Sequence, residues 1–151
     1  MKRMITAILA ALMVLSLVAC GSKTVTVDAQ KLADDLKSKV SYDAEMIATA
    51  AEDFDYYFSV PDGASIAGYE SDGDTSERII VAQCADEAAA KALMSELDSY
   101  LADLKQEAER YTPEEVTRLE DAVMLQQGST VVMCVCADAD AAKDVIKGYL
   151  G

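Results

Sequence analysis

Two short segments of the sequence repeat each other at a spacing of 52 residues, and each comes directly after an apolar run. Residues 84–91 read Cys-Ala-Asp-Glu-Ala-Ala-Ala-Lys and residues 136–143 read Cys-Ala-Asp-Ala-Asp-Ala-Ala-Lys, so six of eight positions agree. In both copies an aspartate stands where it can accept hydrogen bonds from the free amides at the start of a helix. The repeat therefore predicts two strand–strand–helix units in one chain.

Apolar runs separated by turn residues supply the strands of these two units. The four predicted strands are residues 65–70, 79–84, 122–126 and 130–136. The helix after each pair is predicted at residues 86–110 and 138–150, because apolar side chains recur on one helical face there. We therefore predict an α+β fold with a four-stranded, mainly antiparallel sheet.

Two of the predicted strands should lie side by side at the centre of the sheet. Residues 79–82 and 131–136 are apolar at every position, which indicates strands that are covered on both faces. A twofold arrangement of the two units would run these strands antiparallel and place Cys84 and Cys136 at opposite ends of the sheet. A disulfide between these two cysteines is then out of reach.

The chain before the first of these strands predicts two helices that pack on the sheet. Leu32, Leu36 and Val40 recur every four residues and predict the first helix. Apolar and aromatic residues repeat that spacing over residues 46–58 and predict the second. If the helices that end the two repeat units share one face of the sheet, these N-terminal helices are the candidates for covering the other face, with a homodimer partner as the second choice.

Aromatic residues of the second predicted helix are the candidates for a ligand pocket: Phe54, Tyr56, Tyr57 and Phe58. Aromatic side chains at helical spacing are also typical of a hydrophobic core. The sequence alone leaves both interpretations open.

A lipid anchor has the clearest motif in the sequence. Lys2-Arg3 precedes an apolar run that is too short for a membrane-spanning helix, and Leu17-Val18-Ala19-Cys20 closes that run. This order resembles a bacterial lipoprotein signal, which implies cleavage before Cys20 and a diacylglyceryl group on its sulfur. The alternative is an ordinary cleaved leader with a coincidental cysteine. The predicted divisions are a signal peptide at 1–19, a lipidated cysteine and tether at 20–27, and a single α+β domain at 28–151.

The charge balance excludes some classes of partner. Removal of residues 1–19 takes away two basic residues and no acidic ones, which leaves 11 Lys and Arg against 27 Asp and Glu, a formal charge of −16. Nucleic acids and anionic lipid head groups both bind clusters of Lys and Arg, and the basic residues here are scattered. We therefore predict no nucleic-acid binding and a self-repelling, soluble surface.

Motifs for catalysis and metal binding are missing from the sequence. It holds no histidine, which removes Ser-His and Cys-His pairs and the commonest metal ligand. The segment from Asp72 offers oxygen ligands at alternate positions, but Glu77 and Gln83 stand where an EF-hand calcium loop needs a glycine and a bidentate acid. The cysteines after residue 20 have neither zinc nor redox spacing: Cys84, Cys134 and Cys136. We predict no enzyme activity, no metal site and no cofactor.

The whole outline resembles a known family of short bacterial lipoproteins. The resemblance covers roughly residues 28–150 and depends on Tyr111-Thr112-Pro113-Glu114-Glu115, on residues 119–123, and on the closing strand and helix. Thr112 and Glu115 also stand three residues apart, as in a capping box that starts a short helix. The family is called domain of unknown function four-three-five-eight, of clostridial type. The resemblance implies the fold and the lipoprotein address, and it transfers no site.

Together these features predict a non-catalytic binding or interaction module, anchored at the extracytoplasmic face of the plasma membrane. Its partners would be the lipid bilayer, through the Cys20 lipid, and an envelope protein or peptide. The alternative is a lipoprotein that binds a small ligand or cation in association with a transporter.

Overall fold

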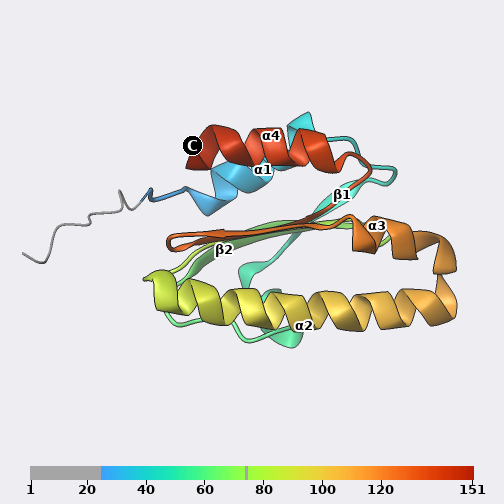
Figure 1. Cartoon of the computed structure of the whole chain (residues 1–151), viewed down its shortest axis with the longest axis horizontal. Coiled ribbons are helices and arrows are strands. Elements are labelled where there is room, and N and C mark those ends of the chain that lie inside the picture. Colours follow the sequence, from blue (N-terminus) through green and yellow to red (C-terminus); the bar gives the residue numbers. More distant parts are fainter. Residues whose placement is uncertain (1–24, 74) are drawn as a thin grey trace, which may run out of the picture.

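The computed structural model describes residues 25–73 and 75–151, so the predicted signal peptide and Cys20 lie outside the described residues. The described chain forms a sheet flanked by helices, which confirms the predicted α+β class (Figure 1). The sheet has five strands rather than the predicted four, in the order β1-β2-β3-β5-β4, and neighbouring strands are antiparallel. Their bounds are β1 Met46–Thr49, β2 Ser65–Ser71, β3 Arg78–Gln83, β4 Val123–Gln127 and β5 Thr130–Val135.

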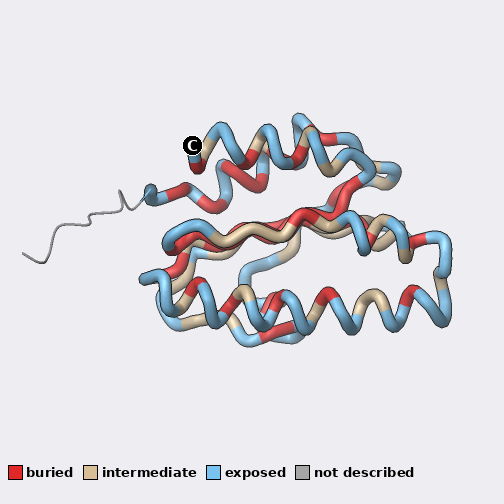
Figure 2. The backbone as a smooth tube through the Cα atoms, viewed as in Figure 1, coloured by how far each residue is buried: buried red, intermediate tan, exposed pale blue. Residues whose placement is uncertain are grey.

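Helices cover both faces of the sheet. The helices α1 (Ala29–Lys39) and α4 (Ala139–Leu150) lie together on one face, and the long helix α2 (Glu87–Tyr111) lies on the other (Figure 1). Buried residues follow the central strands and the sides of the helices that face them (Figure 2). The short elements are η1 Ala51–Tyr56 and η2 Pro113–Glu115, both 3-10 helices, and α3 Val116–Glu120. Over residues 25–73 and 75–151, no helix is both long enough and apolar enough to cross a bilayer.

The two repeat segments start helices in the same way. The side chain of Asp86 accepts a hydrogen bond from the amide of Ala89 at 2.8 Å, and Asp138 accepts one from Ala141 at 2.9 Å. The units β2–β3–α2 and β4–β5–α4 therefore match the prediction from the repeat.

The two repeat helices lie on opposite faces of the sheet rather than sharing one. The register pairs Ile80 with Met133, and residues directly opposite each other point to the same face. Val132, which is the repeat equivalent of Ile80, therefore points to the other face and belongs to the other core cluster. The helix α4 therefore packs on the same face of the sheet as α1, and the two helices lie side by side. The hydroxyl of Tyr149 in α4 donates a hydrogen bond to Asp35 in α1 at 2.7 Å.

The predicted pairing of the central strands is confirmed. Strands β3 and β5 run antiparallel with Arg78 opposite Val135 and Gln83 opposite Thr130. Cys84 and Cys136, which follow these strands directly, therefore lie at opposite ends of the sheet. Both thiols are free and buried, as is that of Cys134.

The second predicted N-terminal helix is wrong. Residues 46–49 form the edge strand β1, paired with β2 from Met46 opposite Ser71 to Thr49 opposite Gly68, and only the short 3-10 helix η1 follows. The chain is aligned for pairing just before β1, because the Glu77 carboxylate accepts hydrogen bonds from the amides of Asp43 and Ala44. Ladder hydrogen bonds with β2 then outweigh the helical spacing of the apolar residues.

Candidate binding surface

A buried ionic network holds the end of the sheet where β3 begins. Glu77 is fully buried, and Arg118 of α3 lies 3.6 Å from its Oε1 and 3.0 Å from Oε2 of Glu115. Arg118 also pairs with Asp43, so one guanidinium faces three carboxylates. Within the described residues, every buried side-chain nitrogen and oxygen has a hydrogen-bond partner. The network is therefore internally satisfied and acts as a structural clamp.

Glu115 joins this clamp to the strand rather than capping its own helix. Its carboxylate accepts hydrogen bonds from the amide of Ser76 at 2.8 Å and from the Ser76 hydroxyl at 2.7 Å. Thr112 makes no side-chain capping bond, so the predicted capping box is wrong. A buried carboxylate gains more from these charge-assisted bonds than from an exposed cap.

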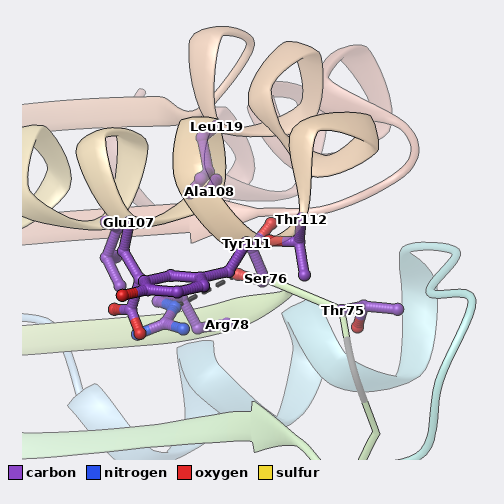
Figure 3. Close-up of a pocket in the computed structure, with 9 residues that line it drawn as sticks. Thr75, Ser76, Arg78, Glu107, Ala108, Tyr111, Thr112 and Leu119 are labelled. Atoms are coloured by element: carbon purple, nitrogen blue, oxygen red, sulfur yellow. Dashed lines mark hydrogen bonds between the residues drawn. The ribbon is translucent and has the colours of Figure 1, made fainter.

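A pocket of about 190 Å³ opens between this clamped end of β3 and the last turns of α2 (Figure 3). Arg78 lies along its floor, and the Tyr111 ring lies over the guanidinium in the view of Figure 3. The lining residues are Thr75, Ser76, Arg78, Leu104, Glu107, Ala108, Tyr111, Thr112 and Leu119.

Arg78 is fixed by several partners at once. Its Nε donates to the carbonyl of Ser76 at 3.1 Å, and its Nη1 donates to the hydroxyl of Tyr100 and lies 3.8 Å from Glu70. The guanidinium carbon also lies 5.4 Å from the centre of the Tyr100 ring, within cation–π range. Burial raises the pKa of Tyr100 to about 12, so this hydroxyl stays protonated at neutral pH. Arg78 and Tyr100 therefore present a preorganised surface.

Exposed tyrosines extend this surface in both directions. Tyr57 packs against Tyr100 with ring centres 5.7 Å apart and remains 44% exposed, and Tyr111 is 76% exposed. Tyr100 and Tyr111 share one face of α2 because their separation equals three helical turns. We call Tyr57, Tyr100, Arg78 and Tyr111 the tyrosine–arginine strip. It combines flat, exposed aromatic area with a fixed positive charge.

The four aromatic pocket candidates divide between core and surface. Phe54 and Phe58 are buried in the core on the α2 side. Tyr57 belongs to the strip, and Tyr56 is 84% exposed beside it in sequence. The residues that line the pocket in Figure 3 do not include these four.

Arg78 and Tyr111 were not among the candidates from the sequence. The sequence does carry one signal for the helical part of the strip. Residues 100, 104, 107 and 111 are separated by four, three and four positions, which places their side chains on one face of a helix. No local pattern shows that Arg78, on a strand, would lie between Tyr100 and Tyr111. The position of Arg78 near these two tyrosines depends on the packing of α2 against one face of the sheet.

The polar side chains of the pocket can form hydrogen bonds with a bound molecule or with a partner surface. These side chains supply hydroxyl groups, one carboxylate and one arginine that is already hydrogen-bonded. Among the residues that the structure describes, no group of three Cys, Asp or Glu side chains is placed to hold a metal ion.

Comparison with known proteins gives one match. A family model described as "Domain of unknown function (DUF4358)" matches residues 53–136. No curated protein and no solved structure matches the chain. The matched segment runs from η1 to the residue after β5 and contains every residue of the tyrosine–arginine strip.

Proposed function

This chain belongs to the DUF4358 family of domains of unknown function, as its sequence resemblance predicted. We propose that it is a membrane-anchored extracytoplasmic module that binds a protein partner without catalysis. The observation that carries this proposal is the tyrosine–arginine strip. Tyrosine and arginine are the residue types enriched at the energetic centres of protein–protein interfaces. Strip residues that are already held in place lose little conformational entropy on binding.

The position of the strip suits a partner that approaches from outside the membrane. The described chain begins at one end of the domain, and the pocket beside Tyr111 lies at the other end of α2 (Figure 1). Residues 21–27 span at most about 25 Å when fully extended. The helix α2 has 25 residues and is therefore about 37 Å long. A lipid on Cys20 would thus hold the first end near the bilayer and leave the strip facing away.

Small-ligand binding is the weaker alternative for the pocket beside the strip. The pocket of about 190 Å³ is smaller than the roughly 300–1,000 Å³ that is usual for sites that enclose drug-sized ligands. The Nε and Nη1 atoms of its arginine already bond to Ser76 and Tyr100. The strip also extends beyond the pocket to Tyr57, which is 44% exposed and can be reached by a protein surface.

The anchor is tested by fatty-acid labelling of the full chain in cells. We expect an alkyne fatty acid to label the wild-type protein, and Cys20→Ala to lose the label and its cleavage before residue 20. Cys84→Ala is the control and should keep the label. Equal labelling of wild type and Cys20→Ala would contradict the anchor.

The strip is tested by crosslinking and capture of the full-length lipoprotein from intact membranes. We expect one stoichiometric protein partner, and at least about tenfold less of it with Tyr57→Ser combined with Tyr111→Ser, since hot-spot side chains dominate binding energy. Val25→Ser combined with Ile47→Ser removes two other exposed apolar residues and should capture the partner normally. Thermal unfolding of both double variants checks that they are folded.

Two outcomes would contradict the strip proposal. Equal capture by both double variants would exclude the strip as the binding surface. Absence of any protein partner, together with a rise in melting temperature on addition of a small molecule or ion, would favour the ligand-binding alternative, because a ligand that binds only the native state stabilises it.

A further inference from the structure

Strand β4 is an edge of the sheet with hydrogen-bonding capacity left over. It pairs only with β5 in the described sheet, through a two-residue turn in which Gly128 takes a φ of +55° at the first central position, as a type II′ turn requires. Gln127 and Thr130 flank that turn and form a hydrogen-bonded pair. The alternation of an antiparallel ladder then directs the N–H and C=O groups of Met124 and Gln126 outward.

This edge lacks the usual protection against added strands. Exposed edge strands are commonly guarded by charged residues, proline or bulges. Residues 123–127 read Val-Met-Leu-Gln-Gln and contain neither a charge nor a proline. The residue types of this edge therefore do not block an added strand.

A groove of about 320 Å³ runs beside this edge, between β4 and α4. Its apolar lining includes Leu125 of the strand and Ile146 and Leu150 of the helix. Lys143 and Lys147 are exposed and stand on its helical side, and no Asp or Glu side chain lines it. Lys143 also forms an exposed ion pair with Asp140, which is not part of the lining, at 3.0 Å. In a chain with 27 acidic and 13 basic residues, this lining reverses the prevailing charge.

We propose that an extended segment of a partner protein binds here as a sixth strand alongside β4. Its main chain bonds to Met124 and Gln126, and alternate apolar side chains enter the groove over Leu125 and Ile146. Acidic side chains that flank them meet Lys143 and Lys147. This is strand addition, in which main-chain bonds supply affinity and side-chain pockets supply specificity. The site is separate from the tyrosine–arginine strip and does not depend on it.

Charge favours such a segment over a second copy of this chain. If β4 paired with its own copy, the added strand would supply Val, Met, Leu and Gln side chains but no carboxylate for Lys143 or Lys147. A twofold interface also brings identical surfaces together, and here both bodies carry the same excess of negative charge. An apolar segment flanked by acids satisfies both the groove and the lysines.

The test uses a blocked, fluorescent heptapeptide, Glu-Thr-Val-Thr-Val-Thr-Glu, titrated into the full-length protein in detergent at low salt with anisotropy as the readout. We expect saturable binding, and at least about tenfold weaker binding to Lys143→Glu combined with Lys147→Glu. A second peptide with lysine in place of both glutamates should show the reverse preference and bind the double variant better than the wild type.

Gln126→Pro isolates the main-chain contribution. Its N–H points away from β5, so proline removes an edge donor and leaves the ladder intact. We expect at least about tenfold loss of peptide binding with Gln126→Pro and none with Gln126→Thr, with thermal unfolding as the check on folding. The strip variant Tyr57→Ser with Tyr111→Ser should bind the peptide as the wild type does. This result would distinguish binding at β4 from binding at the tyrosine–arginine strip.

Three results would overturn the proposal. They are no binding of the first peptide by the wild type, equal binding to Gln126→Pro and Gln126→Thr, and a wild-type dimer in sedimentation that Gln126→Pro abolishes. The last result would assign the edge to a second copy of the chain.

Discussion

Replacing Arg118 with methionine is expected to lower the free energy of unfolding by about 3–5 kcal/mol, because it leaves buried carboxylates without their counter-charge. Arg118 is the shared partner of Glu77 and Glu115, and Glu77 is fully buried. Methionine keeps much of the side-chain volume, so the loss reports the charge rather than a cavity. The amides of Asp43 and Ala44 still donate to Glu77, but they do not neutralise it.

Urea unfolding followed by circular dichroism measures this loss. Lys91→Met is the matched control, because its ion pair with Glu87 at 2.7 Å is exposed on both sides. An exposed pair of this kind contributes less than about 1 kcal/mol. Similar midpoints for the two variants would show that Arg118 does not neutralise the buried acids. The full chain should be used for both, so that the two curves share one reference state.

The clamp around Arg118 also shows where sequence patterns stop being informative. The sequence places Glu77 at the end of a polar turn, with the appearance of a solvated, partly calcium-like loop. In the structure Asp72 and Gly73 are exposed, as that interpretation requires, whereas Glu77 points inward. Its partners come from residues 43–44 and from Arg118, which are distant in the chain. A local pattern cannot reveal partners that only the fold brings together.

The repeat predicted more of the fold than any other feature. It gave both strand–strand–helix units, the capping roles of Asp86 and Asp138, and the antiparallel central strands. It could not give the faces of the two helices, because these depend on register. A shift of one residue moves every side chain of a strand to the opposite face. The pairing of Ile80 with Met133 decides which face each helix covers. Because the residues on both sides of Ile80 and of Met133 are also apolar, the sequence does not distinguish this register from one shifted by a residue.

The segment 46–58 was mispredicted for a related reason. Its apolar spacing fits one side of a helix, and four of its residues also suit a strand: Met46, Ile47, Ala48 and Thr49. Short apolar runs are ambiguous between helix and strand. Pairing with β2 decides between them, and β2 is itself unusual because Gly68 lies in its middle. The role of that glycine leads to the second large effect.

Gly68→Ala is expected to destabilise the protein by at least about 3 kcal/mol or to prevent folding, because overpacking against rigid backbone is not relieved by side-chain movement. A Cβ at this position would lie 2.1 Å from the carbonyl oxygen of Ile79 and 2.9 Å from Cζ of Phe54. The closer atom belongs to the paired strand β3, so the strands themselves would have to separate.

The contrast with Gly148→Ala makes this expectation specific. Gly148 is an exposed residue of helix α4 with open space around the added methyl, so alanine there should stabilise the protein by up to about 1 kcal/mol through helix propensity. Urea unfolding of both variants should therefore move in opposite directions. Combining Gly68→Ala with Phe54→Leu separates the two contacts. If the double variant regained wild-type stability, the Phe54 ring rather than the β3 backbone would be what requires glycine at position 68. We expect no such rescue, because the carbonyl of Ile79 remains in place and is the nearer obstacle.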